Sequence, residues 1–223
     1  MTVPRSIEQI VEEQVRRWEL SRRSTAPPSR REPVIAISRL SGCGGRSLSE
    51  ELARRLGFDF FHKELLTRVA DSAKLSEAII RTVDERGMSA VEEWVQSLFT
   101  ERYLTGDYFR HLCKVLATIA EHGRAVILGR GVSLILPSKA CVRVLLVAPL
   151  EDRVAVVAGR DGISREEARQ RVINTDSERR AYIRRHFHTD MLDCVHYDLV
   201  INTAGLGREA VLSIIETAWK AKK

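Results

Sequence analysis

Hydrophobic positions along the chain fall into two patterns, short continuous runs and helix-spaced repeats. Continuous apolar runs at 34–37, 126–128, 142–147 and 199–201 predict buried strands, and 58–61 predicts a further short strand. Helical patterns separate these runs and end the chain, over about 48–56, 150–158 and 207–220. Because buried apolar strands that alternate with helices are typical of parallel sheets, we expect an α/β fold with helices on both faces of the sheet.

Two long helical stretches interrupt this α/β pattern. The first, about 63–111, is followed by a return to the sheet, and the second covers about 159–190. The first region predicts helices near 63–72, 75–85, 88–99 and 107–122. Both stretches leave from the end of the sheet where ligands of doubly wound folds bind, so we interpret the second as a lid and the first as a helical insertion that binds a ligand.

The first 33 residues differ in pattern from the rest. Residues 6–20 place apolar side chains at helical spacing, which predicts an amphipathic helix that docks on the core or on a protein partner. Residues 21–33 have the composition of a linker. We therefore divide the chain into a helix and linker over 1–33 and a compact domain over 34–223.

Composition and charge narrow the classes of partner. The net charge of +6 suits a nucleic acid, a membrane surface or a phosphorylated small molecule. Arginines in the lid region are interleaved with acidic residues, and aromatic residues make up only 6% of the chain, so nucleic-acid binding ranks last. No apolar run is long enough to cross a bilayer, no signal-like segment begins the chain, and four widely spaced cysteines suit a reducing compartment. We expect a cytoplasmic protein with no membrane partner.

The most informative motif is the glycine-rich loop in VIAISRLSGCGGRS, residues 34–47. Gly42, Gly44 and Gly45 lie between a strand and a helix N-terminus, where free backbone N–H groups bind anions. The loop approaches the P-loop signature, but Arg46 stands where a P-loop has lysine, before Ser47. The alternative is a glycine turn that binds nothing. We favour phosphate binding, because three glycines that open a helix after a buried strand rarely serve packing alone.

With these motifs in their order, the chain resembles the cytidylate kinase-like family, a branch of the P-loop nucleoside monophosphate kinases. The resemblance covers 34–203 and rests on ISRLSGCGGRSL at 37–48, FFHKELL at 60–66, VILGRG at 126–131, VRVLLVAPLEDRV at 142–154, DSERRAYIRRHF at 176–187 and YDLVINT at 197–203. It implies a P-loop NTPase-type parallel sheet with a helical acceptor-binding insertion and a lid. It also implies ATP and Mg²⁺ as cofactors, and transfer of the ATP γ-phosphoryl group to a nucleoside monophosphate, CMP or dCMP first.

The resemblance also implies roles for residues of the loop. The donor phosphates would be wrapped by Ser41, Gly42, Cys43, Gly44, Gly45, Arg46 and Ser47, and Ser47 would bind Mg²⁺ through its hydroxyl. Arg46, with Arg39 as a second candidate, would neutralise the charge that lysine neutralises elsewhere. Arg130, between two glycines after a strand, would hold the acceptor α-phosphate, while Leu128 occupies the family's acidic position.

The lid carries a further set of implied contacts. Asp176 would contact the acceptor ribose, and phosphates would be clamped by Arg160, Arg179, Arg184 and Arg185. Asp176 and Arg179 share a helix face, so a simple ion pair between them is the alternative.

Several other polar residues have weaker signals. His62 stands where the family usually has aspartate, and Asn202 with Thr203 would approach the donor base. Cys43 lies near a helix N-terminus, which could lower its pKa and make it oxidisable, but we favour the alternative that it is only a small loop residue. The polar cluster between His186 and His196 fits no zinc spacing and is better explained as a hinge.

The sequence leaves two classes of function open. One is a nucleoside monophosphate kinase. The other is a non-catalytic nucleotide-binding module with a degenerate P-loop, which would act on a protein partner through the N-terminal helix.

Overall fold

The chain forms two compact units in the computed structural model, which describes residues 6–23, 32–83, 85–101 and 106–223. The helical unit comprises Met1–Glu32 and Phe61–Gly123, and the sheet unit comprises Pro33–Phe60 and Arg124–Lys223. Most of the predicted linker lies outside the described residues, and its first residues belong to the N-terminal helix, which ends at Arg23.

A five-stranded sheet organises the fold. Its strands are β1 (Val34–Arg39), β2 (Asp59–Phe61), β3 (Ala125–Leu128), β4 (Cys141–Val147) and β5 (Leu199–Asn202), in the spatial order β2-β3-β1-β4-β5. β1 pairs in parallel with β3 and with β4, and β4 pairs in parallel with β5. The prediction of an α/β fold with a parallel sheet is confirmed, and the carboxyl ends of the central strands therefore meet at one edge.

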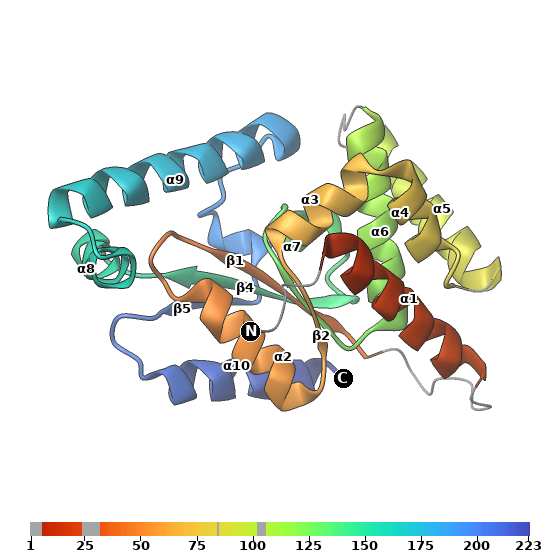
Figure 1. Cartoon of the computed structure of the whole chain (residues 1–223), viewed down its shortest axis with the longest axis horizontal. Helices are drawn as coiled ribbons and strands as arrows, with labels where there is room; N and C mark the ends of the chain where they lie inside the picture. The colour runs from red at the N-terminus through yellow and green to blue at the C-terminus, as the bar shows by residue number, and fades with distance from the viewer. Residues whose placement is uncertain (1–5, 24–31, 84, 102–105) are drawn as a thin grey trace. The chain divides into compact units, whose positions relative to one another are not determined.

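Helices cover both faces of this sheet (Figure 1). The sheet unit contains α2 (Gly45–Leu56), α7 (Val132–Ile135), α8 (Leu150–Asp161), α9 (Arg165–Phe187), the short helix η1 (Cys194–His196) and α10 (Arg208–Lys222). Alternation along β1 sends Ile35 and Ile37 into a core shared with α2 and α10. Ser38 faces the other way, where its hydroxyl lies 3.4 Å from that of Ser133 on α7.

The helical unit is built from α1 (Ile7–Arg23), α3 (Lys63–Asp71), α4 (Ala73–Ile80), α5 (Glu85–Glu101) and α6 (Asp107–His122). The predicted N-terminal helix is present, and its apolar residues Val11 and Trp18 are buried. The Trp18 ring stacks on His122, with ring centroids 4.1 Å apart, and also lies against Phe61. The apolar face of α1 thus packs within its own unit, and binding of a protein partner through α1 stays a prediction.

Membrane insertion has no support from the helices of the described ranges. None of them combines the length and the apolar character that crossing a bilayer requires.

Candidate functional site

The glycine-rich loop follows β1 at the carboxyl edge of the sheet and runs directly into α2. Gly42 and Gly44 have φ angles of +88° and +68°, which side chains with a Cβ rarely adopt. Gly44 is the N-cap residue of α2, and no side chain caps this helix. The amide groups of the first helical turn therefore point toward the loop without a capping partner, which is the local chemistry that binds an anion.

At two positions of the loop, a neighbouring residue leaves no space for a side chain, so glycine is required there. A Cβ at Gly42 would lie 2.6 Å from the main-chain oxygen of Arg153, and a Cβ at Gly45 would lie 2.8 Å from Cγ of Arg39. Gly45 begins α2, so its lack of a side chain makes room for the Arg39 stem rather than allowing an unusual backbone angle.

Side chains of α8 and α9 reach the main chain of this loop. The Ser41 N–H donates to Oδ1 of Asp176 at 2.7 Å, and Nη1 of Arg153 donates to the Ser41 oxygen at 3.1 Å. One turn further along α9, Nη1 of Arg179 donates to the Arg39 oxygen at 3.2 Å. Nη1 of Arg179 also lies 3.8 Å from Oδ1 of Asp176, so the ion pair that the sequence left as the alternative is present.

Arg39 is directed across the site by the glycines around it. Its stem passes Gly45, and a Cβ at Gly129 would lie 2.5 Å from its Nη1 atom. The Arg39 guanidinium is therefore placed where the start of α2 approaches the turn that follows β3.

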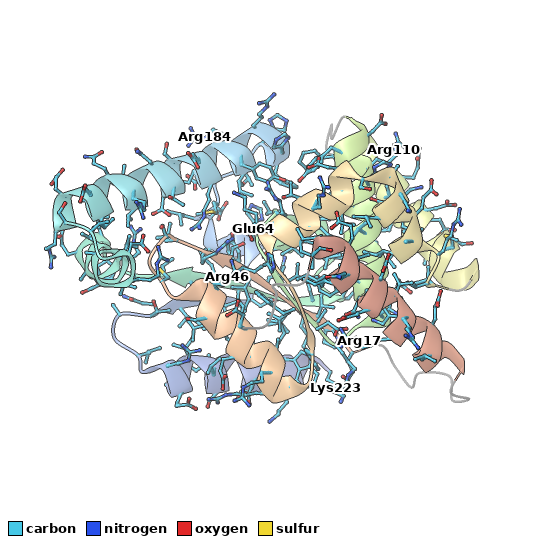
Figure 2. All side chains as sticks on the ribbon, in the orientation of Figure 1. Arg17, Arg46, Glu64, Arg110, Arg184 and Lys223 are labelled. Atoms are coloured by element: carbon cyan, nitrogen blue, oxygen red, sulfur yellow. The ribbon has the colours of Figure 1, made fainter. Side chains whose placement is uncertain are left out.

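Arg46 is placed differently. Its Nε donates to Glu50 at 3.0 Å along the surface of α2, and its side chain is 61% exposed. Figure 2 marks Arg46 on this helix, together with Arg184 on α9. In this arrangement the guanidinium of Arg46 is engaged beside α2 rather than over the loop.

The Ser47 hydroxyl is engaged by neighbours from two elements. Its Oγ donates to the Gly44 oxygen at 3.1 Å and accepts from Nη1 of Arg208 at 3.4 Å. Arg208 also donates to the Ser47 main-chain oxygen at 2.7 Å. Sequence reasoning missed Arg208, because it lies beyond the recognised motifs at the start of α10.

Arg130 occupies a strained turn after β3. Gly129, Arg130 and Gly131 have φ angles of +90°, +55° and +69°. A left-handed backbone costs a non-glycine residue about 1–2 kcal/mol, and such strain collects at functional sites. The Arg130 guanidinium carbon lies 5.2 Å from the centre of the Tyr182 ring on α9, so it is held above an aromatic face near the lid helix.

The remaining predicted lid arginines lie on exposed surfaces. Arg160 pairs with its neighbour Asp161 at 2.6 Å and is 63% exposed, so it is not brought to the loop. Arg184 and Arg185 are exposed on α9.

A cavity of about 400 Å³ lies beside the loop, between α8, α9 and the chain that follows α9. Its apolar walls include Leu40, Leu150, Ile173 and Leu192. Its polar lining includes Asp176 together with Arg153, Arg180 and Arg184, and Arg153 pairs with Asp176 while Arg180 pairs with Asp190. Because these pairs offset part of the positive charge, the cavity suits a ligand that has an apolar body and polar groups.

The structure tests the two interpretations of Cys43. The thiol is buried with 4% exposure, and burial raises its pKa to about 11. This shift is opposite in direction to the lowering considered from the sequence, and the burial agrees with the favoured interpretation of Cys43 as a small loop residue.

The other polar candidates have local structural roles. His62 caps α3 by accepting the Leu65 N–H at 3.4 Å. In the segment after α9, His188 ends the helix in a left-handed conformation and His196 bonds to Thr189 at 2.9 Å. Within the described part of the chain, no three His, Cys, Asp or Glu side chains gather as a metal site would require. Asn202 accepts the Ala204 N–H and so shapes the turn after β5.

Comparison with known proteins adds to this geometry. The model of the cytidylate kinase-like family matches residues 34–205, from the first residue of β1 to the turn after β5. The chain belongs to this family. The family match covers the glycine loop, the strained Arg130 turn and α9, while α1 and α10 fall outside it.

Curated relatives agree with this membership, and a solved structure shares the fold. A cytidylate kinase of Ignicoccus hospitalis is 30% identical over 183 residues, which cover 82% of this chain and 96% of the relative. A cytidylate kinase of Pyrococcus horikoshii is 29% identical over 185 residues, covering 83% and 87%. The crystal structure of an uncharacterized protein from Eubacterium ventriosum shares the fold, with a TM-score of 0.66 at 20% identity, covering 86% of this chain and 99% of the other.

Proposed function

We propose that the protein transfers the γ-phosphoryl group of ATP to a nucleoside monophosphate, with CMP or dCMP as the preferred acceptor. One observation carries this proposal: an uncapped helix N-terminus follows a glycine loop at the carboxyl edge of the sheet, with Arg39 of β1, Arg179 of α9 and Arg208 of α10 beside it. The cytidylate kinases that align over most of the chain support the choice of acceptor.

Charge neutralisation and positioning are the protein's contributions to such a reaction. The acceptor phosphate is already an anionic nucleophile, so no general base is needed, and the developing charge must be balanced by fixed cations and amides. Amides at the start of α2 would hold the donor phosphates. Arg130, on its strained turn, would hold the acceptor phosphate, and the helical unit would supply the acceptor-binding insertion.

Of the two candidates for the role of lysine, the placement favours Arg39. The Arg39 guanidinium lies against Gly129, between the end of β3 and the start of α2, whereas the guanidinium of Arg46 pairs with Glu50 on the helix surface. The sequence favoured Arg46 because only its position in the motif was visible. We therefore assign the phosphate-neutralising role to Arg39.

Magnesium would find few oxygen ligands on the protein. Mg²⁺ keeps several waters and takes much of its coordination from substrate phosphates, so one hydroxyl ligand from Ser47 fits it. Leu128 supplies no carboxylate, and Arg208 already contacts the Ser47 hydroxyl. Bound between nucleotide phosphates, the ion would neutralise part of their charge.

The activity is tested by ADP formation from ATP and Mg²⁺ with CMP, dCMP, UMP, AMP or GMP as acceptor. We expect acceptor-dependent ADP formation with the highest kcat/KM for CMP or dCMP. If calorimetry detects ATP binding but no acceptor yields ADP, the protein is the nucleotide-binding module that the sequence left open, and the kinase proposal is overturned.

The assignment of Arg39 is tested against Arg46 as a matched control. Arg39→Met should lower kcat by about 10²–10³-fold, the loss expected when one fixed donor to a developing charge is removed. Arg46→Met should change kcat by less than about threefold, because a surface i,i+4 pair contributes little. A larger loss for Arg46→Met would return the role to Arg46, and equal losses in the two variants would overturn the assignment to Arg39 alone.

A further inference from the structure

A buried arginine that no motif singled out lies at the centre of the contacts around the loop. Arg153, near the start of α8, is only 8% exposed. Its Nε donates to the Ala148 oxygen at 2.9 Å, and its Nη1 donates both to the Ser41 oxygen at 3.1 Å and to Oδ2 of Asp176 at 2.5 Å. One guanidinium thus joins the end of β4, the loop and α9, which its planar fork of donors allows.

Asp176 completes the arrangement from the opposite helix. Its Oδ2 pairs with Arg153, and its Oδ1 accepts the Ser41 N–H at 2.7 Å. Arg153 and Asp176 therefore engage the N–H and the C=O of the same residue. Ser41 is the first residue of the predicted phosphate loop, but in this structure its amide hydrogen is directed at Asp176.

The surroundings of this contact explain why its geometry matters. Gly42 packs directly against the main chain of Arg153, so the loop has no space to shift toward α8. α8 and α9 are joined by a small apolar cluster of their own, formed by Val154, Val157, Ala168 and Val172. The two helices therefore present Arg153 and Asp176 to the loop as one preformed pair.

A buried ion pair is poor evidence of stability, since desolvation offsets most of its attraction, and its best-attested use is to fix one arrangement over others. Here the arrangement fixed is that of the two peptide units on either side of Ser41, at the start of the glycine loop. The directions of these two units determine where the following amides, from Gly42 to Ser47, can point.

We propose that Arg153 and Asp176 are positioning residues that act as one unit. They orient the glycine loop for the donor phosphates through Ser41, and neither side chain touches the nucleotide. This inference rests on the proposed function. It gives Asp176 a role on the donor side, instead of the contact with the acceptor ribose that the family resemblance implies.

The proposal is tested by calorimetric titration of ATP with Mg²⁺, and separately of CMP, into four proteins: wild type, Arg153→Lys, Asp176→Asn and the double variant. Each single substitution should raise the ATP Kd about tenfold, the effect of losing one charge-assisted hydrogen bond. The double variant should bind ATP as weakly as the single variants and no weaker, because the two residues share one function. The Kd of CMP should stay within about threefold of wild type.

The chain offers a matched control on the same two helices. Glu151 on α8 pairs with Arg169 on α9 at 2.5 Å, but the Glu151 side chain is 57% exposed and that of Arg169 35%. Glu151→Gln should leave the ATP Kd within about twofold of wild type, because exposed pairs contribute little. Additive effects of Arg153→Lys and Asp176→Asn, or an effect of Asp176→Asn on CMP alone, would overturn the proposal.

A second measurement needs no nucleotide and separates this proposal from the kinase proposal. In the ligand-free protein the Ser41 amide should be protected from hydrogen exchange, and Asp176→Asn should accelerate its exchange by roughly tenfold or more. The neighbouring Leu40 amide, which donates to the Leu146 oxygen at 3.0 Å, should keep its protection and serves as the internal control. If wild type binds no ATP, the kinase proposal fails whatever the exchange result. If Ser41 exchanges equally in both proteins, the positioning role fails even in an active kinase.

Discussion

At the carboxyl end of the sheet, β1 leads into a loop that contains residues with left-handed backbone. Charged side chains of α8 and α9 donate to or accept from the main chain at the start of this loop. At the amino end, the same sheet is closed by ordinary packing. The Trp219 indole N–H donates to the Pro33 oxygen at 2.8 Å, and its ring meets Phe58 edge-on at 5.2 Å. Asp198, just before β5, accepts from the Arg143 N–H at 2.8 Å and from the Lys222 ammonium at 2.7 Å.

The two ends differ in how residues with left-handed backbone are grouped. At the carboxyl end five residues with positive φ, among them Arg130, lie in the loop and in the turn after β3, whereas at the amino end Gly57 and Arg124 have positive φ before two separate strands, β2 and β3. Strain of this kind persists only where the surrounding structure fixes it, and it collects at functional sites. The amino end, with its buried tryptophan and paired charges, holds the strands together. Substitutions at the two ends should therefore separate stability from nucleotide binding.

The largest effect on stability is expected at Trp219. Trp219→Ala removes a side chain that is 7% exposed and should lower the free energy of unfolding by about 3–5 kcal/mol. Trp219→Phe keeps an aromatic ring but loses the hydrogen bond to the Pro33 oxygen. Loss of this bond should lower the free energy of unfolding by about 1–2 kcal/mol, in addition to the effect of the smaller ring on packing. Urea denaturation measures both. The ATP Kd of the folded variant should not change, and a marked loss of ATP affinity would show that the two ends are coupled.

The next effect compares two glycines of the loop. Gly42→Ala combines a positive φ with a contact of 2.6 Å to a main-chain oxygen, and should cost about 2–4 kcal/mol. Gly44→Ala shares the positive φ but meets no atom closer than 3.7 Å, and should cost about 1 kcal/mol. Denaturation midpoints decide the order. Equal costs would mean that the approach of Arg153 to the loop adds nothing to the requirement for glycine.

The contrast between these glycines also shows what the sequence could predict. The position of these glycines directly after a run of apolar residues predicted the strand, the turn and the helix, because all three elements depend on the local sequence pattern. The neighbour that leaves no room for a side chain at Gly42 is Arg153, more than a hundred residues away along the chain, and no pattern near Gly42 points to it. The apolar strands fixed the fold class in the same local way, while the sheet order depends on contacts between distant runs.

The candidate site was predictable to a lesser degree. The motif placed Asp176 and Arg179 on one face of a helix, and both do lie at the loop. It also favoured Arg46, whose side chain pairs with Glu50, over Arg39, whose path is visible only in three dimensions. Arg153 resembled an ordinary helical arginine in sequence. Its burial depends on the approach of α9 to the loop, which short-range patterns do not encode.

A smaller effect is expected from acid at the amino end. Burial alone would raise the pKa of Asp198, but hydrogen bonds from Arg143 and Lys222 outweigh it and lower the pKa to about 2. A pKa below the unfolded value of about 3.9 contributes stability above that pH, and this stability is lost as the pH falls from about 4 to about 2.

Asp198→Asn should remove this acid-dependent part of the stability, about 1 kcal/mol after allowance for solvent screening. Unfolding measured by urea at pH 7, 4 and 2.5 tests it. Asp161→Asn is the control, because the pKa of Asp161 is also lowered to about 2 but by surface pairs with Arg160 and Arg171. If both substitutions reduce the loss of stability in acid equally, the burial of the Asp198 cluster does not contribute to that loss.

The smallest effect compares thiols at the two ends. Burial raises the pKa of Cys43, beside the loop, to about 11 and that of Cys141, at the start of β4, to about 12. Cys194 is exposed. With iodoacetamide at pH 8, mass spectrometry should detect labelling of Cys194 first, then Cys43, and Cys141 last, because thiolate fraction and access set the rate.

The effect of ATP on thiol labelling tests whether the loop at the carboxyl end opens independently of the amino end of the sheet. If Cys43 is labelled through local opening of the loop, ATP with Mg²⁺ at ten times its Kd should slow that labelling about tenfold and leave Cys141 unchanged. Protection of both thiols to the same extent would mean that they react only through global unfolding. The strained end would then open no more easily than the packed end, and the proposed separation of stability from binding would not hold.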